Sequence, residues 1–284
     1  MRLAIGLASG LGNAVFMLPA IKALKGLGHR VALYVQTDFP TIELWRRCSY
    51  ADEVHDISEP VGEARLVAGQ WMPPAWKNRA ELRLLPRFQI AYPYTISEAR
   101  SNLRLAEYFG YTGELPDISE WCKALDRTPR WDVGIVPGCK GGIWLRKRWP
   151  GLAAVAEHFI LAGRNVAVFG LESDGVNDIP GEHIRTERIE TLPDALARCR
   201  LIIGTDSGVA HLASSLGIPT VMIFTATSEI KGQPVGPCKI ITPANVSCRP
   251  CQSTQRWQQC ADWKCRSIDQ MSVIKAGEAL IHRL

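Results

Sequence analysis

Apolar residues along this chain form two kinds of segment in alternation. Short continuous runs rich in Val, Ile and Leu are typical of strands buried on both faces. Longer stretches with apolar residues at helical spacing follow most of these runs, and glycines or prolines separate the segments. This succession predicts an α/β protein with parallel sheets. The expected strands are 2–8, 30–36, 53–57, 131–136, 165–170, 201–203, 220–224 and 239–242, and the expected helices are 14–27, 42–48, 97–110, 151–162, 192–199, 209–216 and 269–283.

The alternation occurs twice, which indicates two domains. Residues 126–130, Asp-Arg-Thr-Pro-Arg, have the composition of a linker, whereas residues 58–93 are rich in Pro, Trp and Arg and allow no assignment. We therefore predict Rossmann-like domains at 1–126 and 131–284, the second carrying a Cys-rich loop at 238–265.

Residues 201–224 contain the most informative unit, strand–loop–helix–strand. Asp206 and Ser207 follow the first strand, at the end where parallel sheets bind ligands. Ser207 is a good N-cap, and His211, four residues later, shares its helix face. Because a helix N-terminus attracts anions, the unit suits an anionic, hydroxyl-rich ligand. The alternative is that Asp206 and Ser207 are only caps and that His211 is a buried core histidine.

Two other loops offer groups for phosphate binding. Ser-Gly-Leu-Gly-Asn at 9–13 precedes an apolar helix, and its glycines let the backbone approach a ligand. The loop lacks the G-x-G-x-x-G pattern, which argues against a nicotinamide cofactor. Arg146, Lys147 and Arg148 lie beside a helix start and could neutralise a diphosphate, although a solvated basic turn explains them equally well.

Cysteines are concentrated near the end of the chain. Of nine cysteines, five fall after residue 237, and four of these form the pattern C-x2-C-x8-C-x4-C. Four thiolates in two close pairs can bind structural Zn or Fe, but the second spacing departs from a double C-x-x-C, so free thiols and disulfides remain alternatives. Interleaved Trp and Arg residues also allow a nucleic-acid-binding knuckle, although the lone C-terminal position favours a stapled loop. The candidate ligands are Cys248, Cys251, Cys260 and Cys265.

Composition narrows the class of protein. Hydrophobic residues make up 46% and charged residues 21% of 284, and no apolar run reaches the ~18 residues that cross a bilayer. The N-terminal apolar run is typical of a strand rather than a signal peptide, so we expect a cytoplasmic protein. The net charge of +5 suits phosphate-bearing substrates or the inner face of an anionic membrane, and is too weak to indicate nucleic acid.

The segment Gly-Thr-Asp-Ser-Gly-Val-Ala-His-Leu-Ala at 204–213, followed by Gly-Ile-Pro-Thr at 217–220, resembles the motif of glycosyltransferase family 9, the ADP-heptose heptosyltransferases of lipopolysaccharide core synthesis. The resemblance implies a GT-B fold, in which two Rossmann-like domains face each other across a cleft. The N-terminal domain would lie on the acceptor side and the C-terminal domain would bind the donor. The implied reaction is inverting transfer of a heptose-like sugar from a nucleotide-diphosphate donor, ADP-linked, to a hydroxyl of a glycolipid, glycan or protein, without a catalytic metal.

The same resemblance assigns site residues. The catalytic positions would be Asn13, Lys147 and Asp206, with Lys147 and the helix N-termini stabilising the departing diphosphate. Related protein heptosyltransferases carry an iron-bound cysteine-rich loop. The donor-binding positions would be Gly12, Lys147, Arg148, Glu172, Thr205, Asp206, Ser207, Gly208 and His211.

Asn13 departs from the family pattern, which has an aspartate there as the presumed general base. An amide cannot take a proton at neutral pH, and losing a positioned base costs ~10²–10⁴-fold in rate. Three explanations of this departure are open. The acceptor of this enzyme is easier to activate, another carboxylate such as Asp38 serves as the base, or the protein has lost transferase activity. We favour a changed acceptor.

Three alternatives from other classes remain open. A nucleotide-sugar epimerase shares the architecture but needs further carboxylates near the leaving group. A catalytically altered sugar-nucleotide-binding protein is favoured by Asn13. A metal-knuckle nucleic-acid binder predicts binding that weakens steeply with salt.

Overall fold

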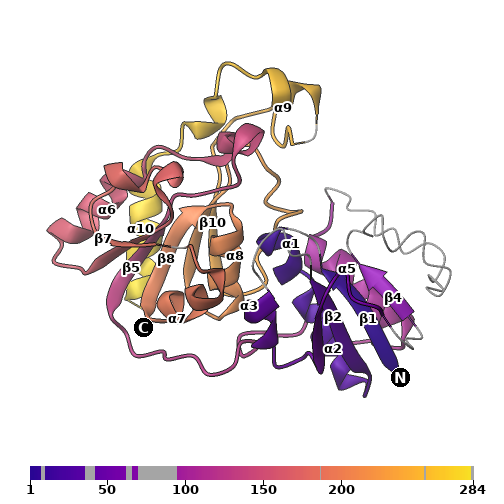
Figure 1. Ribbon diagram of the computed structural model, residues 1–284. Coiled ribbons are helices and arrows are strands. Elements are labelled where there is room, and N and C mark those ends of the chain that lie inside the picture. Colours follow the sequence, from indigo (N-terminus) through magenta and orange to yellow (C-terminus); the bar gives the residue numbers. More distant parts are fainter. Residues whose placement is uncertain are drawn as a thin grey trace.

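A computed structural model of the chain describes residues 1–7, 10–35, 42–61, 66–69, 95–185, 187–252 and 254–282. Two predictions lie outside the described residues: Ser9 of the N-terminal glycine-rich loop and Asp38, the alternative carboxylate. The described elements form two parallel sheets with helices packed against them (Figure 1).

The first sheet belongs to the N-terminal part of the chain and has the order β3-β2-β1-β4. All its pairings are parallel, with Arg2 opposite Arg30 at the start of the central pair. Its strands are β1 (Arg2–Leu7), β2 (Arg30–Val35), β3 (Glu53–Asp56) and β4 (Leu66–Gly69), and the helices of this part are α1 (Leu11–Val15), α2 (Leu18–Gly26), α3 (Ile42–Arg46) and α5 (Glu98–Tyr108).

The second sheet has the order β10-β9-β8-β5-β6-β7 and is also parallel throughout. Its strands are β5 (Trp131–Val136), β6 (Val166–Phe169), β7 (Glu182–Ile184), β8 (Cys199–Thr205), β9 (Thr220–Ile223) and β10 (Cys238–Ile241). The α-helices are α6 (Leu152–Leu161), α7 (Leu192–Ala197), α8 (Gly208–Ser215), α9 (Gln255–Gln259) and α10 (Gln270–Ile281), and the 3₁₀ helices are η1 (Gly142–Lys147), η2 (Glu172–Asp174), η3 (Val176–Asp178), η4 (Ile189–Thr191) and η5 (Lys264–Arg266).

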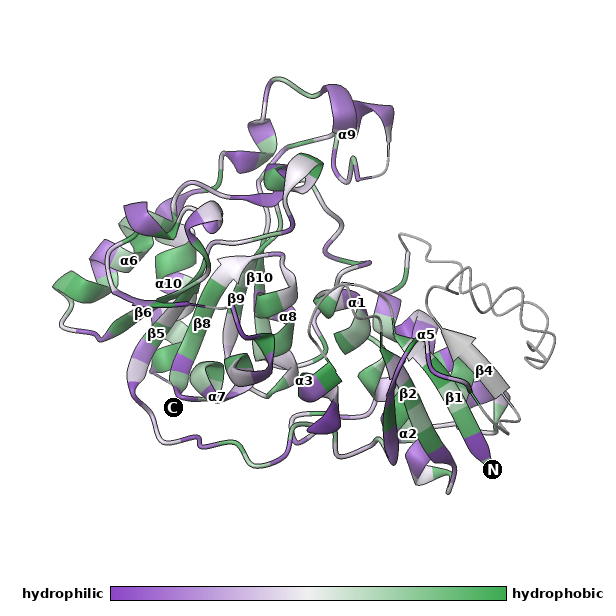
Figure 2. Ribbon diagram, viewed as in Figure 1, coloured by the Kyte–Doolittle hydropathy of each residue, from purple (hydrophilic) through white to green (hydrophobic). Residues whose placement is uncertain are grey.

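The apolar runs predicted as strands are strands, and buried residues pack against both faces of β1 and β2. Every residue of β1 after Arg2 is buried, as is every residue of β6. Hydrophobic colour dominates much of β1, β2 and β8 in Figure 2, whereas α9 in the Cys-rich segment is largely hydrophilic. Continuous burial explains why these strands show apolar runs rather than alternation.

The prediction of one helix over 14–27 is wrong. The chain forms α1, a turn at Phe16–Met17, and then α2, with Pro19 in the first turn of the new helix. Proline lacks the N–H that a continuous helix would need at this position, and it is well tolerated in a first turn. Strand β7 and helix α9 were not predicted, and α7 ends at Ala197, so that Cys199 begins β8 instead of ending the helix.

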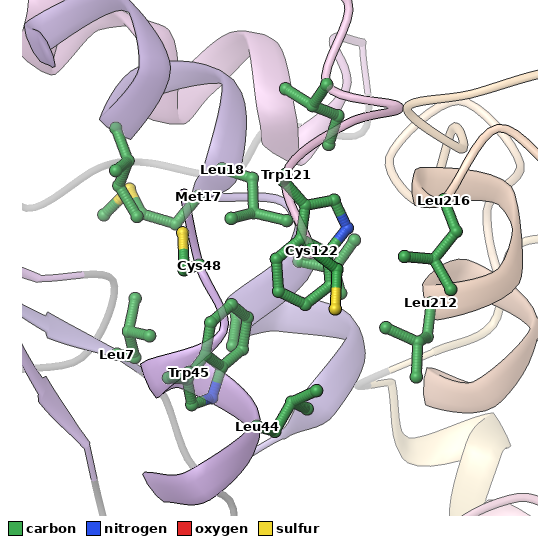
Figure 3. Packing of buried hydrophobic residues seen from close by; sticks show 14 of the residues in the cluster. Leu7, Met17, Leu18, Leu44, Trp45, Cys48, Trp121, Cys122, Leu212 and Leu216 are labelled. Atoms are coloured by element: carbon green, nitrogen blue, oxygen red, sulfur yellow. The ribbon is translucent and has the colours of Figure 1, made fainter. Parts of the chain in front are cut away.

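One hydrophobic cluster spans both sheets. The segment after α5 carries Trp121, whose ring stacks on Trp45 of α3 with centroids 5.4 Å apart. On its other side lie Leu212 and Leu216 of the α8 region, as Figure 3 shows. The indole Nε1 of Trp121 donates a hydrogen bond of 3.1 Å to Ser215 Oγ. The two sheets are therefore joined through a shared buried core. Within the described ranges, no helix is long and apolar enough to span a bilayer.

Candidate functional site

The turn between β8 and α8 places buried polar residues at the carboxyl end of the second sheet. Thr205 ends β8, Asp206 follows, and Ser207 caps α8 by accepting a hydrogen bond from the Ala210 N–H at 3.4 Å. The predicted strand, turn, helix and N-cap are thus confirmed. Thr205 Oγ1 donates to the Pro137 carbonyl at 3.4 Å, which ties this turn to the loop after β5.

The Asp206 carboxylate is the centre of a buried polar group. Only 6% of Asp206 is exposed. Its Oδ2 accepts from Lys147 Nζ and from Thr227 Oγ1, both at 2.7 Å, and its Oδ1 lies 2.8 Å from His211 Nε2. Lys147 Nζ also donates to the Asp206 carbonyl at 3.0 Å. Sequence analysis predicted that Lys147, Asp206 and His211 belong to one site, and the structure brings these three side chains together.

The environment of Asp206 keeps its side chain ionised. Burial acts to raise the pKa of this carboxyl, but the positive charge of Lys147 and the hydrogen bond with His211 outweigh it and hold the pKa well below its usual range. A carboxylate that is so weakly basic cannot take up a proton near neutral pH. Asp206 is therefore suited to positioning its cationic partner rather than to general-base catalysis.

The basic turn does not act as a single cluster. Lys147 ends η1 and contacts Asp206, whereas Arg148 Nη2 donates to the Ser173 carbonyl at 2.6 Å. Arg146 Nη1 donates to the Cys260 carbonyl of the Cys-rich segment at 2.7 Å. Of the three cations, Lys147 is the one that joins the group around Asp206.

Glu172 begins η2, just after β6, as predicted, and its side chain is exposed. The carboxylate that contacts the basic turn is Asp174, two residues later. Its Oδ1 lies 3.3 Å from Arg148 Nη2, and its Oδ2 accepts from the Leu171 N–H at 2.9 Å. A Cβ atom at Gly138 would lie 2.6 Å from the Asp174 carboxyl, so this glycine leaves room for it. Sequence analysis missed Asp174.

Helix α1 meets α8 at a close contact of two glycines. A Cβ on Gly208 would lie 3.0 Å from Leu11 Cβ and 3.2 Å from the Gly12 backbone nitrogen. The Phe16 ring packs edge-on against His211 with centroids 4.7 Å apart. Gly12 therefore approaches the α8 N-terminus, and Asn13 beside it is exposed.

The four candidate ligand cysteines share one small lobe. Cys251 and Cys265 are buried in a cluster with Trp257. Burial raises the pKa of both thiols, and the other cysteines of the set raise it further. The cysteines are thus near one another, but in the part of the chain that is described no three His, Cys, Asp or Glu side chains have a metal-binding arrangement. The metal-ligand set therefore stays a prediction.

Thr227 and Glu98 were also missed by sequence analysis. Thr227 follows β9 and reaches Asp206 across the carboxyl edge of the sheet, while Glu98 is a buried carboxylate at the start of α5. Only the position of Thr227 just after a predicted strand could have indicated it.

A family model described as glycosyltransferase family 9 (heptosyltransferase) matches residues 98–261, more than half of the chain. The chain belongs to glycosyltransferase family 9. It is therefore a glycosyltransferase, and the resemblance of the 204–213 motif is confirmed. Lipooligosaccharide heptosyltransferase 2 of Haemophilus influenzae is 31% identical over 114 residues, which cover 34% of this chain and only 32% of that relative.

Solved structures of the family share the fold. A family 9 glycosyl transferase from Veillonella parvula matches with a TM-score of 0.76 and 18% identity, covering 100% of this chain and 98% of its own. Escherichia coli ADP-heptose lipopolysaccharide heptosyltransferase II gives 0.72 and 16%, covering 100% and 99%. The iron-containing dodecameric glycosyltransferase TibC of enterotoxigenic E. coli gives 0.66 and 16%, covering 100% and 78%. The GT-B fold implied by the sequence is confirmed.

Proposed function

We propose that this family 9 enzyme transfers a heptose-like sugar, with inversion, from an ADP-linked donor to a hydroxyl group of a glycoconjugate. The observation that carries the proposal is the contact of Lys147 with the buried Asp206 and His211 at the N-terminus of α8. Two structural neighbours support the donor: heptosyltransferase II is named for ADP-heptose, and TibC has been solved with ADP-D-β-D-heptose.

Lys147 would meet the leaving group. As the acceptor oxygen attacks the anomeric carbon, the bond from that carbon to the diphosphate oxygen breaks, and its electron pair leaves with ADP. An ammonium group held in place by Asp206, beside a helix N-terminus, stabilises this developing negative charge without having to reorganise. Arg148, Glu172, Thr205, Ser207 and Gly208 complete the proposed donor site.

In this proposal the chain has two domains. The domain at 1–126 binds the acceptor, and the domain at 131–284 binds the donor. Asn13 is exposed on α1, next to the contact between Gly12 and α8, and would face the acceptor hydroxyl. Glycolipid, glycan and protein acceptors fit equally. A cytoplasmic setting, with peripheral contact at the inner membrane face for a lipid-linked acceptor, is supported by the net charge of +5.

Ligand-induced stabilisation tests the donor. A nucleotide at ~100 times its dissociation constant adds about 2.7 kcal/mol, which raises the melting midpoint by about 5 °C or more at this size. ADP and ADP-heptose should stabilise the wild type more than UDP, GDP or CDP conjugates. Lys147→Ala should lose most of this shift, while Lys275→Ala, an exposed lysine of α10, should keep it.

Other outcomes correct the proposal in separate ways. A preference for UDP or GDP would discard the ADP-linked donor and retain the transferase. Equal stabilisation of Lys147→Ala and the wild type by ADP would show that the donor phosphates bind elsewhere.

A further inference from the structure

The start of α5 carries a buried carboxylate, that of Glu98, on which the charges of Lys147 and Asp206 act. Ser97 caps this helix, and the Glu98 N–H donates to the Lys231 carbonyl at 2.8 Å, which fixes the helix start to the loop after β9. Only 8% of Glu98 is exposed. The charged side chains that act on its carboxyl are Lys231, Asp206 and Lys147, all from the C-terminal part of the chain.

No partner of this carboxylate lies among the described residues. The Glu98 side chain makes no hydrogen bond and no ion pair there, and a buried carboxylate is costly without a partner. Lys147 is already committed to Asp206 at 2.7 Å. An apolar residue or glutamine would fill the position at lower cost, so packing alone does not account for a glutamate.

Helix α5, which carries Glu98, is hydrogen-bonded to the turn that follows α1, the helix of Asn13. One turn along α5, Asn102 Nδ2 donates to the Phe16 carbonyl at 3.0 Å, just after α1, the helix that carries Asn13. The Phe16 ring in turn packs on His211, the partner of Asp206. Helix α5 is thus bonded to the turn after α1, and that turn contacts His211 through the Phe16 ring.

We propose that Glu98 is the catalytic base of the transfer reaction, replacing the carboxylate that the family pattern has at position 13. This inference rests on the proposed function. The acceptor O–H proton passes to a Glu98 oxygen while the acceptor oxygen bonds to the anomeric carbon and ADP departs towards Lys147. Glu98 later releases the proton to solvent.

The protonation behaviour of Glu98 suits this role. Burial raises its pKa to about 7; Lys231 and Lys147 act to lower it, and Asp206 acts to raise it. A base works best when its pKa lies near the operating pH. Asp206, whose pKa lies below its usual range, cannot replace Glu98.

The test compares Glu98→Gln with Glu157→Gln, an exposed glutamate on α6, as the matched control. The assay measures ADP release from ADP-heptose, with water or a supplied glycan as acceptor, at saturating donor. Glu98→Gln should lower kcat by ~10²–10⁴-fold with little change in donor KM, and should lose the rise of kcat through neutral pH. Its stabilisation by ADP should equal or exceed that of the wild type, because a nearby negative charge has been removed.

Rescue separates a base from a structural residue. Asn13→Asp combined with Glu98→Gln should recover at least about tenfold of the lost rate, because a carboxylate returns to the acceptor side. If Glu98→Gln binds ADP and turns over within twofold of the wild type with the same pH profile, the base assignment is overturned while the donor site stands. If the wild type neither binds ADP nor releases it, the proposed function fails and the base assignment falls with it.

Discussion

The carboxylate of Glu98, which has no partner in the described part of the chain, should lower the stability of the fold, and the loss should depend on pH. The pKa of this side chain is about 7 in the folded protein, against an ordinary value of 4.5. Below pH 4.5 the group is protonated in both the folded and the unfolded chain and has no effect. As the pH rises from 4.5 to 7, the unfolded chain ionises first, so the wild type loses stability over this window.

The size of the effect follows from the two pKa values. Each tenfold change in proton affinity is worth 1.36 kcal/mol, so the interval from 4.5 to about 7 corresponds to about 3 kcal/mol above pH 7. Glu98→Gln resembles the protonated side chain in shape and cannot ionise. We therefore expect this variant to match the wild type near pH 4.5 and to exceed its free energy of unfolding by about 3 kcal/mol at pH 8.

Urea unfolding at a series of pH values measures the difference directly. Glu157→Gln, the exposed control, should differ little from the wild type across the same range. The reasoning is refuted if Glu98→Gln and the wild type have equal stability at pH 8, or if the variant is the less stable protein there. Either result would mean that the carboxylate has a stabilising partner in the folded state.

Three other predictions follow from the site and the core. Asn13→Asp should raise ADP release in the wild-type background by less than it does beside Glu98→Gln, as single-turnover rates would show. If the Cys-rich lobe binds Zn or Fe, elemental analysis of protein purified without oxygen should find about one metal per chain, and Cys251→Ser should lose it; a metal-free wild type would rule the site out. Leu212→Ala should lower the free energy of unfolding by about 2–5 kcal/mol, because it opens a cavity in the core shared by both sheets; denaturant midpoints measure it, and a loss below about 1 kcal/mol would contradict that packing.

The parts of the fold that the sequence predicts well are those governed by local rules. The apolar β-branched runs form strands. Ser207 caps α8 because an N-cap bonds to the first turn of its own helix and depends on no distant residue. His211 lies beside Asp206 because one helical turn brings them together. The break between α1 and α2 also has a local cause in Pro19, and a stricter use of the proline rule would have found it.

The rest of the site depends on contacts between distant residues, which a single sequence does not contain. Lys147 and Asp206 are 59 positions apart, and their pairing becomes visible only when η1 and β8 meet at one edge of the sheet. Glu98 has the composition of an ordinary helix start, Ser-Glu, and only tertiary packing buries it. Glu172 and Asp174 lie on the same short turn, so spacing alone could not show which of them Arg148 contacts.

The core around Trp121 limits how this chain can be recombined with others. Residues 126–130 lie between the elements of the two sheets and offer an obvious place to cut the chain when parts are exchanged between family members. Trp121 nevertheless packs against Leu212 and Leu216 and bonds to Ser215 on the far side of that cut. A hybrid that takes its first sheet from another family member would therefore need the matching face of α8 from that same parent, so the smallest exchangeable unit is discontinuous in sequence.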